Sequence, residues 1–175
     1  MPDAGRFFFA AWPAPEIQDA LGRIAEGLRQ ECGGRAVPAR NIHLTLVFLG
    51  DVPRQRAAAL YDLAATIEAG AFELKLDRAG YWRHNRIVWA GTSACPPALA
   101  RLVERIEQCL SADGFAIDKR PYVPHVTLLR NARRAPGPGL PCLVDWPVAR
   151  FALVESAVRD RGRAYEVRRE WRLAA

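Results

Sequence analysis

The sequence contains no apolar run long enough to cross a bilayer, which takes about 20 residues. The apolar run near its start, residues 7–12, is also too short for a signal peptide. Half of the 175 residues are hydrophobic, which excludes an intrinsically disordered protein. At about 150 residues per domain, we expect one domain over residues 1–175. We expect it in the cytoplasm, as a monomer with no membrane partner.

Cysteine is also scarce. The four cysteines form no C-x-x-C pair and have no metal-finger spacing: Cys32, Cys95, Cys109 and Cys142. A chain of this length buries enough surface to fold without disulfides or a structural metal. We therefore expect reduced thiols, as in a cytoplasmic protein, and they indicate no function.

Lysine accounts for only two of the 25 basic residues, and the other 23 are arginine. The formal net charge of +6 favours partners that contain phosphate. However, an arginine excess beside abundant alanine is also what a GC-rich genome produces without selection for binding. Charge alone therefore leaves nucleic-acid binding open.

The hydrophobic pattern predicts a mixed α+β chain. Apolar residues at three-and-four spacing predict helices, and short apolar or alternating runs predict strands. Helices are expected over residues 15–30, 53–69 and 97–112. Strands are expected over residues 6–11, 41–49, 72–76, 86–90, 122–129, 151–158 and 164–171. The residues between 76 and 86 are expected to form a connection or an irregular hairpin, and residues 135–141 a connection.

One short motif occurs twice. His43-Leu44-Thr45-Leu46 recurs as His125-Val126-Thr127-Leu128, although the whole chain has only three histidines and four threonines. Because side chains alternate along a strand, each copy places an imidazole and a hydroxyl on one face and two aliphatic side chains on the other. If the two halves of the chain face one another, two His-Thr pairs line one cleft.

Two imidazoles across a cleft suit phosphodiester chemistry. A neutral imidazole takes a proton from the attacking oxygen and a protonated one gives a proton to the leaving oxygen. The threonine hydroxyls can donate hydrogen bonds to phosphate oxygens. No metal is needed, and no third histidine or carboxylate lies at ligand spacing, since Asp118 is seven residues from His125. The alternatives are structural strand histidines or a metal site, and His84 is expected at the surface.

The residues around both motifs resemble the bacterial RNA 2′,3′-cyclic phosphodiesterases, also called 2′-5′ RNA ligases, of the 2H phosphoesterase superfamily. Residues 43–50 match the family pattern H-x-T-L-x-F-L-G, and residues 120–130 contain its P-H-x-T-L-x-R. Residues 6–10, 86–91 and 151–156 also fit, so the resemblance spans nearly the whole chain.

The resemblance implies a bilobal fold with pseudo-two-fold symmetry, in which two antiparallel sheets face a central cleft and the helices lie outside. It implies a hydrolase that needs no cofactor or metal and opens a terminal 2′,3′-cyclic phosphate on RNA to leave a 2′-phosphate. The partners would be RNA ends, including tRNA fragments, or cyclic nucleotides. Family members also join tRNA halves reversibly through a 2′-5′ linkage, and the resemblance extends to that side activity.

By analogy with the superfamily, His125 is the base toward water and His43 the acid toward the departing 3′-oxygen. Thr45 and Thr127 are expected to orient the phosphate. The family motif includes Arg130, although its odd offset from His125 places it on the opposite strand face unless a bend or bulge turns it. Tyr122 and Trp82 are candidates to stack on the terminal base. Phe48 is another, with core packing as the stronger interpretation.

Two alternative functions remain open from the sequence. A related 2H enzyme acting on 2′-5′ oligonucleotides or on cyclic nucleotides would use the same cleft chemistry. A non-catalytic RNA- or nucleotide-binding module would need neither imidazole, so the intact His-Thr pairs favour an enzyme.

Overall fold

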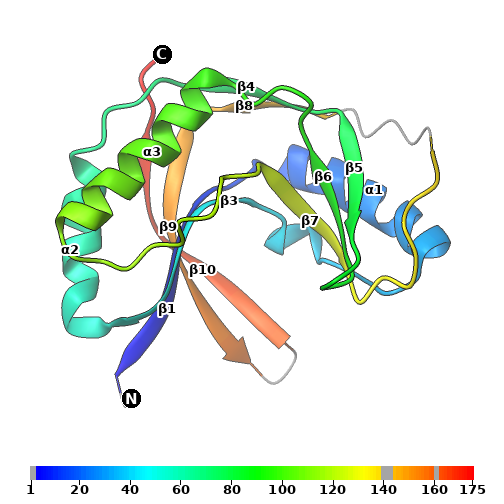
Figure 1. The fold of residues 1–175 in the computed structure, drawn as a ribbon, viewed down its shortest axis with the longest axis horizontal. Coiled ribbons are helices and arrows are strands. Elements are labelled where there is room, and N and C mark those ends of the chain that lie inside the picture. The colour runs from blue at the N-terminus through cyan, green and yellow to red at the C-terminus, as the bar shows by residue number, and fades with distance from the viewer. Residues whose placement is uncertain (1–2, 139–143, 160–161) are drawn as a thin grey trace.

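In the computed structural model, residues 3–138, 144–159 and 162–175 are described, and they form an α+β fold (Figure 1). The helices are α1 (Pro15–Cys32), α2 (Arg54–Ala65) and α3 (Pro97–Ala112), with a short 3-10 turn, η1 (Ala39–Asn41). The strands are β1 (Ala4–Ala11), β2 (Arg35–Ala36), β3 (Leu44–Pro53), β4 (Phe72–Leu76), β5 (Arg78–Trp82), β6 (Ile87–Gly91), β7 (His125–Arg130), β8 (Val144–Val148), β9 (Arg150–Arg159) and β10 (Gly162–Arg172).

The main sheet consists of two antiparallel halves. Strand order is β10-β9-β1-β3-β7-β6-β5, with β2 beside β7. The halves β10-β9-β1-β3 and β7-β6-β5 meet where β3 pairs with β7, and that junction is a single residue pair, Leu44 with Val126. The predicted α+β class with two facing antiparallel sheets is confirmed, and this one pair joins them.

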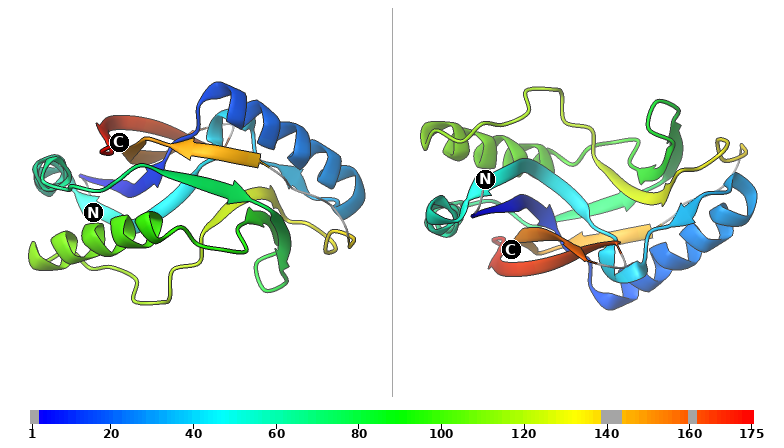
Figure 2. Two further views of the ribbon diagram at one scale, coloured as in Figure 1. Left: turned by 90° about the horizontal axis from the view of Figure 1, so that it is seen from above. Right: turned by 90° about the horizontal axis from the view of Figure 1, so that it is seen from below.

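Each half of the sheet has helices on its outer side. Helix α1 contacts β2, β7 and β8, whereas α2 and α3 contact β3 and each other. Figure 2 shows α1 and α3 on opposite sides of the molecule. The buried side chains of α3 follow helical spacing, and they are Leu99, Leu102, Val103, Ile106 and Leu110. The periodic pattern that predicted these helices is therefore the pattern of side chains they bury.

Some strands differ from the expectation. Strand β5 lies in the segment expected as a connection or irregular hairpin, and it pairs with β6 along its full length. The short strand β2 and the strand β8 were not predicted. Strand β8 pairs with β4 in a separate two-stranded ribbon, and both strands alternate buried and exposed residues. The predicted connection 135–141 and Cys142 lie partly or wholly outside the described residues.

Two further findings concern the described part of the chain only. No helix within it is both long and apolar enough to cross a membrane. The described cysteines Cys32, Cys95 and Cys109 are free thiols, as expected, and burial raises the pKa of Cys32 and Cys95.

Candidate active site

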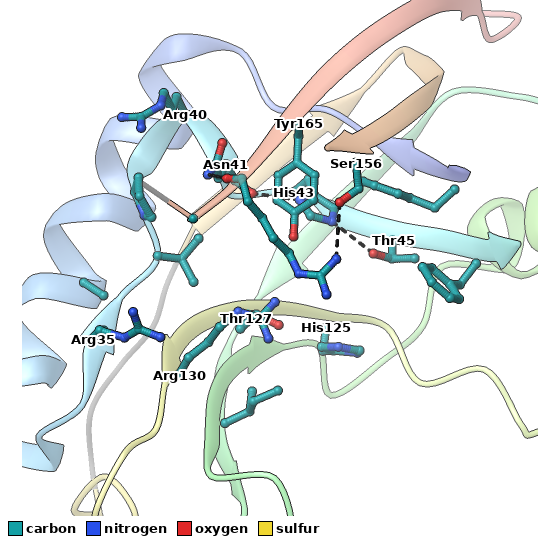
Figure 3. Close-up of a pocket in the computed structure, with 18 of the residues that line it drawn as sticks. Arg35, Arg40, Asn41, His43, Thr45, His125, Thr127, Arg130, Ser156 and Tyr165 are labelled. Carbon is teal, nitrogen blue, oxygen red and sulfur yellow. Dashed lines mark hydrogen bonds between the residues drawn. The ribbon is translucent and has the colours of Figure 1, made fainter. Parts of the chain in front are cut away.

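The two repeated motifs meet at the junction between the sheet halves. Leu44 of β3 pairs with Val126 of β7 in antiparallel register, and both side chains are fully buried. Continuing that register by one residue sets His43 opposite Thr127 and Thr45 opposite His125. Neighbouring positions along a strand point to opposite faces, so all four polar side chains lie on the face away from the core. Figure 3 shows His43 and His125 on the two sides of one pocket.

A main-chain carbonyl fixes the tautomer of each imidazole. His43 Nδ1 lies 2.8 Å from the carbonyl oxygen of Asn41, and His125 Nδ1 lies 2.9 Å from that of Val123. A carbonyl oxygen only accepts, so in both rings Nδ1 donates its proton and Nε2 holds the free lone pair. In both motifs the partner is two residues before the histidine. The reactive nitrogen of each neutral ring is therefore Nε2.

The surroundings of the two histidines differ. The indole of Trp12 stacks on the His43 ring, with 5.1 Å between centroids and 5° between planes. Phe8 lies 4.9 Å from the same ring and Tyr165 meets it edge-on at 5.1 Å. One aromatic contact is found for His125 among the described residues, with Trp82, also edge-on, at 4.5 Å. His43 is therefore the more enclosed of the two.

This enclosure lowers the basicity of both rings. Burial lowers the pKa of His43 from 6.5 to about 4, and the positive charge of Arg130 and the neighbouring His125 add to the shift. The pKa of His125 is lowered as well, first by burial and then by Arg130. Both imidazoles are neutral at neutral pH in the free protein. Thr45 can then donate its hydroxyl proton to Nε2 of His43, across 3.1 Å.

A bulge turns Arg130 into the cleft. Val88 and Trp89 of β6 pair with Leu129 and Thr127 of β7, which leaves Leu128 as an extra residue on β7. Leu128 and Leu129, which follow Thr127, are then both buried. Alternation shifts by one place, and Arg130 returns to the face of His125 and Thr127, where it lines the pocket. From the sequence alone, Arg130 could reach the cleft only if a bend or bulge turned it, and this bulge does so.

The first motif contains the same irregularity. Phe9 and Ala10 of β1 pair with Val47 and Thr45 of β3, which leaves Leu46 as the extra residue. Phe48 is therefore turned out of the core and lines the pocket, with 44% of its surface exposed. The expectation that Phe48 packs in the core is wrong, because the extra residue at Leu46 shifts the alternation of β3 by one place.

The pocket has a volume of about 710 Å³ and a lining rich in arginine. Its described lining contains five arginines and no aspartate or glutamate: Arg6, Arg35, Arg40, Arg130 and Arg163. A basic cleft of this kind attracts anions. Arg6 also lies over the Phe48 ring, 5.1 Å from its centroid.

Tyr122 lies outside this lining, contrary to the expected contact with substrate. Its hydroxyl donates a hydrogen bond to the main-chain carbonyl of Thr45 across 3.0 Å, and its ring packs against the core. Burial raises the pKa of that hydroxyl. Tyr122 therefore braces the strand that contains Thr45. Trp82 does line the pocket, and His84 is exposed as expected.

Three aromatic residues around His43 were not predicted as site residues from the sequence. Phe8 comes from β1, Trp12 from the turn after it and Tyr165 from β10, far from either motif along the chain. Apart from the fit of residues 6–10 to the family, their sequence signal was aromatic character on predicted strands or next to them. Among the described residues, no group of three or more His, Cys, Asp or Glu side chains is placed to hold a metal ion.

Comparisons with known proteins agree with this geometry. A family model described as LigT like Phosphoesterase matches residues 12–89. The chain is 36% identical to the Escherichia coli protein named RNA 2′,3′-cyclic phosphodiesterase, over 99% of both chains. A Thermus thermophilus protein of the same name is 33% identical over 93% of this chain and 87% of its own length.

A solved structure has the same fold. Escherichia coli LigT complexed with 3′-AMP superimposes with a TM-score of 0.88 and 32% sequence identity, over 99% of this chain and all of that one. The likeness therefore covers both sheet halves, and it extends to the sequence as well as to the fold. The chain belongs to the family of LigT-like phosphoesterases.

Proposed function

We propose that this protein hydrolyses the 2′,3′-cyclic phosphate at the end of an RNA strand and leaves a 2′-phosphate. The observation that supports this most is the quartet of His43, Thr45, His125 and Thr127, whose histidines both direct Nε2 at one basic cleft. The relatives named RNA 2′,3′-cyclic phosphodiesterase support the same reaction, and so does the binding of 3′-AMP by Escherichia coli LigT.

In the proposed reaction His125 is the general base and His43 the general acid. Nε2 of His125 takes a proton from water, whose oxygen forms a bond to phosphorus. The bond from phosphorus to the ribose 3′-oxygen breaks, and that oxygen receives a proton from Nε2 of His43. One water is consumed, and the product is a 2′-phosphomonoester beside a free 3′-hydroxyl. Solvent exchange then resets the two protons.

The unequal enclosure of the histidines supports this assignment. Three aromatic rings, of Phe8, Trp12 and Tyr165, surround His43, which limits access of water to it. His125 has one such neighbour, so it is the better placed to meet an attacking water. The general acid needs no water beside it, only the leaving oxygen of the bound ribose.

Arg130 and the two threonines bind the phosphate in this scheme. A guanidinium can donate two parallel hydrogen bonds to phosphate oxygens, and the Thr45 and Thr127 hydroxyls add one each. Phe48, exposed on the β3 side of the cleft, offers its ring to the terminal base. The base then lies toward β3 and the phosphate toward β7, with the ribose between them.

Substrate binding also favours the protonated form of His43, whose proton comes from solvent. In the free protein the charge of Arg130 contributes to the lowered pKa of both histidines. A bound phosphate compensates that charge and accepts hydrogen bonds from protonated imidazole, both of which raise the pKa of His43. We infer that His43 takes up its proton together with the substrate.

The reaction is tested on purified protein in the presence of EDTA, with adenosine 2′,3′-cyclic phosphate and a short RNA ending in a 2′,3′-cyclic phosphate. Phosphorus NMR identifies the product isomer. His43→Ala and His125→Ala should each lower kcat by about 10²-fold or more. His84→Ala, the third histidine and outside the cleft, is the matched control and should retain activity.

Three outcomes would contradict the proposal. Turnover that persists in both motif variants would remove the histidines from the reaction. Wild-type protein that binds the RNA end without converting it would favour the non-catalytic binding module instead. A 3′-phosphate product would reverse which ribose oxygen leaves, and with it the geometry proposed for the cleft.

A further inference from the structure

A second, smaller hollow adjoins the catalytic cleft, and none of the steps above uses it. It has a volume of about 270 Å³, close to the lower end of small-ligand pockets, about 300 Å³. Its lining comes from the turn after β1, from η1 and from the start of β10. Five residues line both cavities, so the two communicate along a shared rim: Arg40, Asn41, Gly162, Arg163 and Tyr165.

Trp12 forms the wall between the two cavities. It lines the hollow and not the cleft, whereas His43 lines the cleft and not the hollow. Since one face of the indole is covered by the stacked His43 ring, the hollow is bordered by the rest of the indole surface. A half-buried indole at the edge of a cavity is a surface on which a planar base can stack.

Two arginines on the shared rim have no carboxylate partner among the described residues. These are Arg40 and Arg163, and both are exposed. Figure 3 shows Arg40 at the edge of the pocket, away from both histidines. The described hydrogen bond of the Arg163 guanidinium is a long one, 3.4 Å to Ser156 Oγ. The Arg163 main chain is anchored separately, since its carbonyl accepts from Asn41 Nδ2 across 3.3 Å.

The charge of the lining exceeds what a cyclic phosphate needs. A 2′,3′-cyclic phosphodiester has one negative charge, and Arg130 lies beside the catalytic quartet to meet it. Arg40 and Arg163 line the hollow as well as the cleft, and in the hollow a cyclic mononucleotide has no further charge to offer. A longer strand has one more phosphate for each further nucleotide.

We propose that the hollow binds the nucleotide that precedes the terminal one in an RNA strand. Its base stacks on the free surface of Trp12, and the phosphate that links it to the terminal nucleotide lies between Arg40 and Arg163. This rests on the proposed function, and it narrows the substrate class: the protein selects the end of a strand over a free cyclic mononucleotide.

The test compares two substrates that differ by one nucleotide. Adenosine 2′,3′-cyclic phosphate fills the cleft alone, whereas the dinucleotide ApA with the same cyclic end also reaches the hollow. Wild-type kcat/KM should be at least about tenfold higher for the dinucleotide. Arg40→Ala and Arg163→Ala should each lower the ratio of the dinucleotide value to the mononucleotide value about tenfold.

A control variant separates local contact from general charge. Arg101→Ala removes the same charge from an exposed position on α3, and Arg101 lines neither cavity. This variant should leave kcat/KM unchanged for both substrates. In a plot of the logarithm of the dinucleotide binding constant against the logarithm of the salt concentration, the slope should decrease in magnitude by about one for each rim arginine removed. The control variant should keep the wild-type slope.

The outcomes distinguish this inference from the proposed function. Activity on both substrates without a preference for the dinucleotide would overturn the subsite and leave the reaction intact. Equal losses on both substrates in the rim variants would also overturn it, because the arginines would then serve the terminal phosphate. Wild-type protein inactive on both would overturn the proposed function, and this inference with it.

Discussion

The pKa of His43 allows a test of the active site that needs no substrate. Burial lowers that pKa from 6.5 to about 4, so the folded protein keeps the ring neutral at pH values where the unfolded chain binds a proton. The free energy of unfolding is therefore undiminished above about pH 6.5. It falls as the pH drops from that value toward 4, because only the unfolded state gains the proton.

The size of the loss follows from the two pKa values. Between pH 7 and pH 4.5 the linkage relation gives a fall of about 2.5 kcal/mol from His43 alone. A His43→Gln variant lacks this pH-dependent loss of free energy, because glutamine does not bind a proton in this pH range. Carboxylates titrate over the same interval in both proteins, and their effect cancels in the comparison. The wild-type protein should thus lose about 2.5 kcal/mol more than the variant on acidification.

Urea unfolding at the two pH values measures this difference, and NMR titration of the His43 ring gives the pKa directly. Equal acid losses in the two proteins would refute the reasoning, since His43 would then titrate alike in the folded and unfolded states. Added phosphate should shift the ring titration upward in the wild-type protein. No shift would contradict the uptake of a proton with the substrate.

Two further substitutions test packing and ion-pair contacts outside the two motifs. Gly80→Ala would set a Cβ 2.1 Å from the indole of Trp89, which packs against Trp82 at 5.4 Å. Trp82 in turn contacts the His125 ring, so moving the two indoles displaces His125. We therefore expect kcat to fall about tenfold or more while circular dichroism reports an intact fold. Glu155→Gln weakens the buried carboxylate's 2.8 Å contact with Arg54, and urea unfolding should show a loss of about 1–2 kcal/mol.

The repeated motif was predictable because its information is local. Alternation along a strand was enough to place His43 beside Thr45, and His125 beside Thr127, on one polar face. The helices followed from spacing for the same reason. Neither inference needed to know which strands pair.

Features that depend on pairing were not predictable in this way. The bulges at Leu46 and Leu128 exist only relative to β1 and β6, and they decide the directions of Phe48 and Arg130. The aromatic enclosure of His43 likewise joins β1 to β10, the first and last strands of the chain. Tyr122 was expected to stack on the terminal base, whereas its hydroxyl donates a hydrogen bond to the main-chain carbonyl of Thr45.

For the proposed function, the bulges also explain how a nearly symmetric pair of motifs can bind an asymmetric substrate. Histidine and threonine occupy equivalent positions in both, and in both an extra residue follows the threonine. The side chain five residues after the histidine is therefore turned into the cleft twice, as Phe48 in one half and Arg130 in the other. A ring favours a base and a guanidinium favours a phosphate. In the proposed reaction, this one difference sets the substrate's direction across the cleft, and that direction decides which histidine meets the water and which meets the leaving oxygen.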